Sequence, residues 1–228
     1  MKKIVILTGA GISAESGLGT FRDEGGLWAQ HRIEDVATPE GFARNPDLVH
    51  HFYNARRVQA QQARPNAAHE ALARLQSASD GEVILVTQNV DDLHERAGSQ
   101  NVIHMHGALS GALCASCDAR WRAPLKMNRD SICPKCAAHS ARPDIVWFGE
   151  MPYQMDEIYH HLREADLFAA IGTSGNVYPA AGFVQDATQF GAGTIELNLE
   201  PSATVSAFAQ TSFGKATDTV PAWVESLL

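Results

Sequence analysis

Residues 3–14 read KIVILTGAGISA, a short apolar run that leads directly into two glycines. The run IVIL at positions 4–7 has no polar residue, which is typical of a strand buried on both faces of a parallel sheet. Gly9, Gly11 and Ala14 then match the pattern G-x-G-x-x-G/A between a strand and a helix. Glycines at such a turn let the backbone approach a pyrophosphate. The same pattern also fits a purely structural turn.

Similar apolar runs recur along the chain, namely EVILVT (82–87), DIVWF (144–148), LFAAIG (167–172) and TIELNL (194–199). Helical patterns lie between these runs. One begins near Pro46, a second follows Asn66, which suits an N-cap, and a third is QMDEIYHHLREA at 154–165. The alternation predicts an α/β fold with a doubly wound parallel sheet.

Two segments interrupt this alternation. Residues 29–65 have helical patterns without a clear strand, and residues 111–142 contain all four cysteines. We interpret both as insertions that pack together as a smaller lobe, one helical and one metal-binding. The main domain then consists of residues 1–28, 66–110 and 143–228.

The composition limits the class of protein. The chain has 228 residues, 45% of them hydrophobic, which is enough for a buried core. A formal net charge of −8 argues against nucleic acid as a partner. No apolar run approaches the roughly 18–20 residues of a membrane span, and the first apolar run is too short for a signal peptide. We therefore expect a cytoplasmic protein without membrane contact, and a monomer by default.

The cysteines form two C-x-x-C pairs. Cys114 and Cys117 precede Cys133 and Cys136, with fifteen residues between the pairs. Four thiolates at this spacing suit one tetrahedral zinc ion, and four protein ligands leave no open position for water. The zinc ion is therefore predicted to be structural. The alternative is four free thiols in a loop with little apolar content to hold it together.

Polar residues follow the second predicted strand. In TQNVDDLH (87–94), Gln88, Asn89 and Asp91 come just past the apolar run, where open parallel sheets bind ligands. The same residues would also serve as a cap for the next helix. VIHMHGAL (102–109) then brings His104 and His106 toward the same crevice.

These motifs together resemble the sirtuins, a family of NAD-dependent protein deacylases. The matching segments are GAGISAESGLGTFRDEGGLW (9–28), TQNVDDLH, HMHG (104–107), the cysteine pairs, RPDIVWFGE (142–150), GTS (172–174) and NLE (198–200). They follow the order of the family and extend over nearly the whole chain. The resemblance implies a Rossmann-like domain with a smaller zinc-binding and helical lobe.

The resemblance also implies a reaction. The acyl oxygen of a modified lysine attacks the anomeric carbon of the NAD ribose as nicotinamide leaves. His106 then acts as the general base on a ribose hydroxyl, which attacks the resulting imidate, and water completes the reaction to give free lysine and O-acyl-ADP-ribose. An imidazole titrates near neutral pH, which suits this role. Asn89 and Asp91 are implied to position the ribose and the nicotinamide.

Binding roles follow from the same motifs. Phe21 is implied to shield the reactive carbon from water, and Arg22 to steady the loop. The implied NAD-binding residues are Gly9, Ala10, Gly11, Ala14, Phe21, Arg22, Trp28, Gln88, Asn89, Val90, Asp91, Gly172, Thr173, Ser174, Asn198, Leu199, Glu200 and Ala216. Val146, Trp147, Phe148 and Gly149 are implied to bind the acyl-lysine substrate by strand addition. For Trp147 a place in the apolar core is the alternative.

Two segments depart from the family. GLGTF (17–21) stands where many relatives have an Ile-Pro pair, and Gly175 replaces a bulkier residue. Neither position is implied to have a chemical role, and we expect both to tune loop mobility and acyl preference.

The segment YNAR (53–56) predicts the acyl group. One branch of the sirtuins has a Tyr-x-x-Arg pair in the acyl pocket and prefers acyl groups that end in a carboxylate, such as succinyl or malonyl. Arg56 offers a charge-assisted grip on a carboxylate and Tyr53 a hydroxyl donor. Ala14 also resembles this branch. A packing ring beside a solvated cation is the alternative, and acetyl-lysine remains an expected substrate.

Three other functions stay open at this point. Protein mono-ADP-ribosyl transfer uses the same cofactor and the same first bond cleavage. A non-enzymatic zinc module with an NAD-sensing domain would bind NAD without releasing nicotinamide. Hydride transfer fits least, because no acid ends a second strand about 20 residues after the glycine turn; an acid near a strand end appears only at Glu200.

Overall fold

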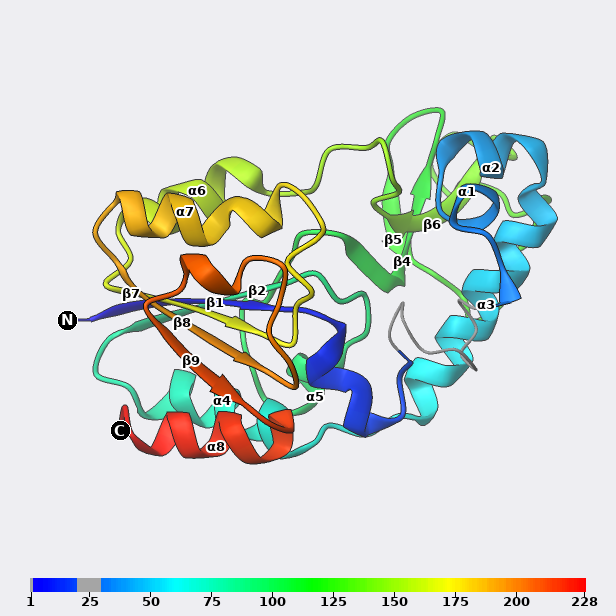
Figure 1. Cartoon of the computed structure of the whole chain (residues 1–228). Helices are drawn as coiled ribbons and strands as arrows, with labels where there is room; N and C mark the ends of the chain where they lie inside the picture. Colours follow the sequence, from blue (N-terminus) through cyan, green and yellow to red (C-terminus); the bar gives the residue numbers. More distant parts are fainter. Residues whose placement is uncertain (1, 20–29) are drawn as a thin grey trace.

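The computed structural model describes residues 2–19 and 30–228. A parallel sheet lies between two layers of helices, and a smaller lobe of helices and short strands lies beside it (Figure 1). Both chain ends lie at the side of the sheet domain that faces away from this lobe. None of the helices in the described part of the chain is long and apolar enough to cross a membrane.

The main sheet has six strands in the order β3-β2-β1-β7-β8-β9, and every neighbouring pair is parallel. The order reverses direction beside β1, which confirms the doubly wound fold. The strands are β1 (Lys3–Thr8), β2 (Glu82–Thr87), β3 (Ile103–His104), β7 (Leu167–Ile171), β8 (Gly193–Asn198) and β9 (Gln210–Phe213).

Side chains of the central strand alternate between two apolar cores. Ile4 and Ile6 face the layer formed by α4 (Ala67–Ala78) and α8 (Ala216–Glu225). Val5 and Leu7 face the opposite layer, formed by α6 (Met155–Arg163) and α7 (Phe183–Gln189). A strand with apolar residues on both faces therefore reads as a continuous run.

Three predicted helices are confirmed. They are α3 (Pro46–Gln62), α4 and α6. Asn66 caps α4 as expected, because its side chain accepts a hydrogen bond from the Ala68 amide. The remaining helical segments are η1 (Ala10–Ser16), α1 (Ile33–Val36), α2 (Pro39–Arg44), α5 (Leu93–Arg96), η3 (Ala180–Gly182) and η4 (Val205–Ala207).

The smaller lobe contains a second sheet, in which β4 (Gly107–Cys114) pairs antiparallel with β5 (Arg120–Arg122) and with β6 (Ala141–Ile145). The prediction that 144–148 is a strand of the parallel sheet is therefore wrong. Ile145 and Trp147 of this segment are buried in a cluster with side chains of α3 and the lobe instead. The second sheet extends past both ends of the predicted 111–142 insertion, because β4 begins at Gly107 and β6 ends at Ile145.

Candidate active site

The carboxyl ends of β1 and β7 meet in an unusually close contact. The Gly9 amide donates to Ile171 O at 2.9 Å and the Gly11 amide to Gly172 O at 2.8 Å. A Cβ at Gly11 would lie 2.7 Å from the Gly172 Cα, and a Cβ at Gly9 would lie 2.8 Å from the Gly172 carbonyl oxygen. The two glycines of the first turn are thus required by the neighbouring loop, whatever else binds there.

Asn89 and Asp91 lie at this junction, both largely buried. The Asn89 amide nitrogen donates to Gly9 O at 3.1 Å and to the Ser13 hydroxyl at 3.2 Å. The Ser13 hydroxyl donates to Asp91 Oδ2 at 3.3 Å, and the Leu93 amide donates to Asp91 Oδ1 at 3.1 Å. Burial raises the pKa of Asp91 against these hydrogen bonds. The strand-end residues therefore form one network with the glycine turn.

The ends of β7 and β8 join the same edge. Gln88 Nε2 donates to the Thr173 hydroxyl at 2.9 Å, and Asn198 Nδ2 donates to Thr173 O at 2.7 Å. Ser174 follows Thr173 and is half-buried, whereas Leu199 and Glu200 are exposed. Ala216 lies in the first turn of α8, which is joined to η1 because Glu15 accepts from the amide and hydroxyl of Thr217. Of the sequence-predicted residues, Phe21, Arg22 and Trp28 lie outside the described part of the chain.

The two histidines of HMHG differ in their surroundings. His104 Nε2 pairs with Glu95 at 2.7 Å and its Nδ1 contacts Asn89 O at 3.1 Å. Burial acts to lower the pKa of His104, but these contacts outweigh it and raise the pKa. His106 Nδ1 contacts Gln88 O at 3.2 Å, while burial lowers its pKa. Because a carbonyl only accepts, Nδ1 of a neutral His106 holds the hydrogen and Nε2 is left as a base.

Tyr53 is buried against Trp147, whose indole Nε1 donates to the Tyr53 hydroxyl at 3.0 Å. The Arg56 guanidinium lies 5.6 Å from the Tyr53 ring centre. Burial lowers the pKa of Arg56, and attraction from Tyr53 and Asp91 opposes this shift. Arg56 is therefore close enough to Asp91 to interact with the junction of β1, β2 and β7. The adjacent Arg57 instead donates to Leu109 O at 2.8 Å inside the lobe.

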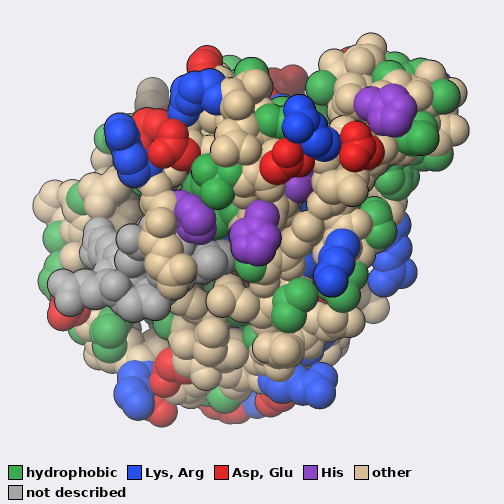
Figure 2. All heavy atoms as spheres, turned by 90° about the vertical axis from the view of Figure 1, so that its right-hand side faces the viewer, with side chains coloured by type: hydrophobic (Ala, Val, Ile, Leu, Met, Phe, Trp, Pro, Cys, Tyr) green, Lys and Arg blue, Asp and Glu red, His purple; other side chains and the backbone are tan. Residues whose placement is uncertain are grey.

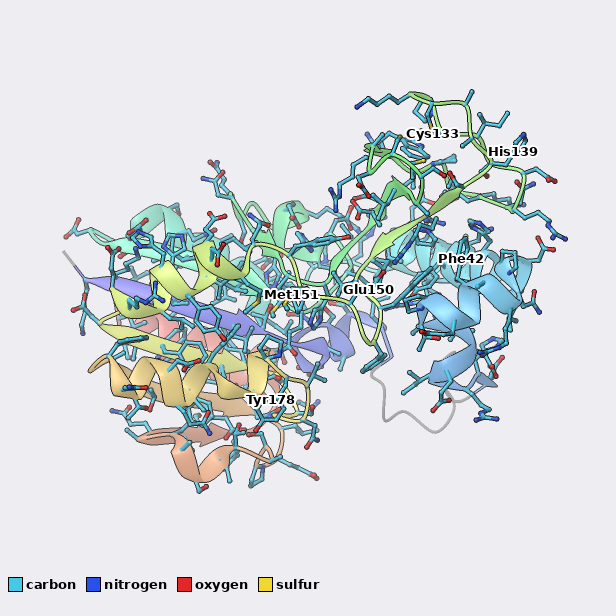
Figure 3. All side chains as sticks on the ribbon, turned by 90° about the horizontal axis from the view of Figure 1, so that it is seen from above. Phe42, Cys133, His139, Glu150, Met151 and Tyr178 are labelled. Atoms are coloured by element: carbon cyan, nitrogen blue, oxygen red, sulfur yellow. The ribbon has the colours of Figure 1, made fainter. Side chains whose placement is uncertain are left out.

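The segment after β6 runs between the two parts of the molecule. The Val146 amide donates to His106 O and the Phe148 amide to Ala37 O, both at 3.0 Å. Gly149 has a φ of +93°, a conformation that L side chains rarely adopt. Figure 3 shows Glu150 and Met151 at this boundary, with Tyr178 on the side of the sheet domain.

The four cysteines converge at the far end of the lobe, where Figure 3 labels Cys133. Their Sγ atoms lie within 4.8 Å of one another, with 3.6 Å between Cys114 and Cys136 and 3.8 Å between Cys117 and Cys133. A tetrahedral zinc ion with bonds of about 2.3 Å separates its sulfur ligands by about 3.8 Å. The geometry therefore fits one structural zinc ion held by Cys114, Cys117, Cys133 and Cys136.

Comparison with known proteins identifies the family. The profile of the Sir2 family matches residues 9–179. This chain belongs to the Sir2 family. It is 56% identical over 230 residues to a protein of Caulobacter vibrioides named NAD-dependent protein deacylase, covering 99% of this chain and 97% of that protein. A protein of Vibrio parahaemolyticus with the same name is 57% identical, with 100% and 95% covered.

Solved structures of the Sir2 family have the same fold. The crystal structure of a Sir2 homologue in complex with NAD is 40% identical to this chain and superimposes with a TM-score of 0.90. The match covers 98% of this chain and 88% of the homologue.

Two residues of the site in this Sir2 chain were not among those predicted, Ser13 and His69. The Ser13 hydroxyl bridges Asn89 and Asp91 and also lies 3.4 Å from His69 Nε2. Burial lowers the pKa of His69 to about 4, so the ring is neutral. His69 is the third residue of α4, and its Nδ1 closes the capping box with Asn66. The pattern Asn-x-x-His predicts this capping box, but it does not reveal the distant contact with Ser13.

The surface of the smaller lobe of this Sir2 chain carries charges of both signs. Figure 2 shows Lys and Arg side chains beside Asp and Glu side chains on this face. The expectation that the chain binds no nucleic acid stays a prediction, as do the monomeric state and the cytoplasmic location.

Proposed function

We propose that this Sir2 chain is an NAD-dependent protein-lysine deacylase that prefers succinyl and malonyl groups and also removes acetyl groups. Its relatives at 56% and 57% identity are named NAD-dependent protein deacylases, and a homologue at 40% identity was solved with NAD. NAD supplies the ADP-ribose that accepts the acyl group, with nicotinamide as the leaving group.

His106 carries the proposed chemistry. Its Nδ1 faces Gln88 O, and its pKa is lowered by burial, so Nε2 is a neutral base at pH 7. In the described residues no group hydrogen-bonds to this Nε2. It therefore takes the proton of the attacking ribose hydroxyl.

The residues around His106 bind and orient the reactants. Asn89 and Asp91 hold the ribose and the nicotinamide; the Ser13 hydroxyl contacts both side chains, and the Gly9 carbonyl also accepts from Asn89. Residues 172–174 meet phosphate and ribose at the end of β7, and Asn198 and Glu200 meet the adenosine. The amides of Val146 and Phe148 are already used within the protein. A substrate strand therefore pairs through other groups of 146–149, such as the Gly149 amide.

The acyl preference rests on the position of Arg56. It lies beside Tyr53 and interacts with Asp91, so it faces the junction that contains Asn89 and the end of β2. A purely apolar acyl chain leaves this buried cation without a new anionic contact, whereas a terminal carboxylate provides one. An acetyl group is smaller and is not excluded by the pocket.

The test compares NAD-dependent turnover of one peptide that bears either succinyl-lysine or acetyl-lysine. Arg56→Met with Tyr53→Phe should abolish desuccinylation and spare deacetylation, and His106→Ala should abolish both. A parallel loss of both activities in the double variant would show that the pair is only structural. Product analysis separates the second candidate, mono-ADP-ribosyl transfer, because that reaction leaves ADP-ribose on the acceptor instead of releasing free lysine and O-acyl-ADP-ribose.

A further inference from the structure

Trp147 packs against an ion pair formed by Arg142 and Glu150. Its side chain is 2% exposed, and the Arg142 guanidinium carbon lies 3.5 Å from the ring centre. Arg142 donates to both carboxylate oxygens of Glu150, at 2.6 Å and 2.9 Å. A planar guanidinium that stacks on an indole and binds a carboxylate through two hydrogen bonds has little freedom to turn.

The same pair fixes the backbone of the segment. Arg142 also donates to Ile145 O at 2.8 Å, and Glu150 Oε2 accepts from the Trp147 amide at 2.8 Å. One ion pair thus joins the beginning of β6 to the turn after Trp147, at the boundary where Figure 3 shows Glu150. Both the ring and the amide of Trp147 are held in one orientation.

This orientation determines what the Tyr53 hydroxyl does. A phenol hydroxyl has one hydrogen to donate and two lone pairs to accept, whereas indole and guanidinium groups only donate. The Tyr53 oxygen accepts from Trp147 Nε1 at 3.0 Å, and the Arg56 guanidinium carbon lies 5.6 Å from the centre of the Tyr53 ring. Both neighbours are donors, so neither takes the hydroxyl hydrogen. In residues 2–19 and 30–228 the Tyr53 hydroxyl has no protein acceptor.

We propose that Trp147, positioned by Arg142 and Glu150, is a specificity-determining residue that makes the Tyr53 hydroxyl a donor toward the acyl carboxylate. The proposal rests on the proposed preference for succinyl and malonyl groups. Without the indole N–H, a lone pair of the Tyr53 oxygen is free and the hydroxyl turns toward other partners. Arg142 and Glu150 act through Trp147 and are positioning residues.

The test uses Trp147→Phe, which keeps an aromatic ring and removes the N–H donor. We expect kcat/KM for succinyl-lysine to fall about tenfold, mainly through KM, because a hydrogen bond to a charged group is weakened. Deacetylation should fall by less than desuccinylation, because an acetyl group has no carboxylate for the hydroxyl to meet, so the succinyl-to-acetyl ratio of kcat/KM should fall. Equal losses of both activities would overturn the proposal and make Trp147 a packing residue.

A double-mutant cycle with Tyr53→Phe isolates the route through the hydroxyl. In that background Trp147→Phe should leave the succinyl-to-acetyl ratio of kcat/KM unchanged. A further fall of the ratio in the Tyr53→Phe background contradicts the proposal, since Trp147 would then act by another route.

Two further comparisons distinguish a failure of this inference from a failure of the proposed function or of folding. If the parent enzyme shows no preference for succinyl-lysine, the proposed function fails; if Arg56→Met loses a preference that Trp147→Phe retains, only the present inference fails. Should Trp147→Phe not fold, Glu150→Gln and Arg142→Lys replace it, since both keep the indole and loosen the ion pair. Each should lower the succinyl-to-acetyl ratio about threefold, and an unchanged ratio in both counts against the proposal.

Discussion

Gly172→Ala tests the close contact between the ends of β1 and β7. Gly172 has a φ of +61°, and a Cβ at this position would lie 2.4 Å from the Ile12 nitrogen and 2.8 Å from the Gly11 carbonyl carbon. Gly191 offers a matched control, because its φ is +90° and no atom lies within 4 Å of its added Cβ. The two substitutions share the left-handed backbone and differ in the space available.

The expected destabilisation follows from these two contributions. A left-handed conformation costs an alanine about 1–2 kcal/mol at both positions. At Gly172 the methyl group must also displace backbone atoms that cannot rotate away, which adds about 1–3 kcal/mol. We therefore expect Gly172→Ala to lower the free energy of unfolding by about 2–5 kcal/mol, and Gly191→Ala by about 1–2 kcal/mol. At about 2–4 °C per kcal/mol, Tm falls by roughly 4–20 °C and 2–8 °C.

Thermal unfolding measures the loss of stability, and steady-state kinetics measures the change in the KM for NAD. Separation of the β1 and β7 loops should disturb the hydrogen bond from Gln88 to Thr173, so the KM for NAD should rise about tenfold in Gly172→Ala. Gly191 lies after α7, outside this edge of the sheet, and its variant should keep the KM of the parent. Equal Tm shifts in the two variants would refute the steric argument. An unchanged KM for NAD in Gly172→Ala would show that the contact between the β1 and β7 ends does not affect NAD binding.

Three other predictions concern protons and metal. Burial lowers the pKa of His106, so kcat/KM should rise with pH and level off above an apparent pKa that lies below 6.5, and an apparent pKa above 6.5 would contradict His106 as the base. His50 is buried with a pKa lowered to about 4. The unfolded state therefore binds a proton first as pH falls, and stability should drop by about 1–2 kcal/mol between pH 7 and pH 5, less steeply in His50→Leu. A thiol reagent that displaces metal should release one zinc ion per chain and lower Tm, and two or more ions, or none, would contradict the four-cysteine site.

The sequence predicted those strands whose apolar runs are continuous. Runs such as IVIL and EVILVT correspond to β1 and β2, because a strand covered on both faces has no polar position to interrupt the pattern. DIVWF is also mostly apolar, yet it belongs to the smaller lobe, since an apolar run does not say which layer covers a segment. The edge strand β9 reads QTSF and is mostly exposed, so it has no apolar signature. Helix α8 was not predicted, because Pro221 lies in its interior, where proline is unfavourable.

The site was predictable where residues that lie together in the structure belong to the same short sequence motif. The C-x-x-C pairs imply a metal by spacing alone, and Gln88, Asn89 and Asp91 lie at a strand end, as the motif TQNVD indicated. Ser13 and His69 were not predictable in this way. Their contact joins residues 56 apart, and only the packing of α4 against η1 brings them together. Arg142 and Glu150 lie in one motif, but the stacking on Trp147 depends on the turn between them.

The zinc site and the proposed catalytic base lie at opposite ends of one pair of strands. Cys114 is paired with Ala141 at one end of β4 and β6, and Gly107 is paired with Ile145 at the other. Along β6 only four residue steps of about 3.4 Å separate these ends, which puts them about 14 Å apart, too far for the metal to take part in the chemistry. His106 directly precedes this far end and accepts a hydrogen bond from the Val146 amide. A zinc ion held by the four cysteines would fix the register at that end of the strands and thereby how His106 faces the segment 146–149. Cys133→Ser should therefore impair deacylation of succinyl-lysine and acetyl-lysine peptides by the same factor, unlike Trp147→Phe, and a selective loss of either activity would contradict a purely structural metal.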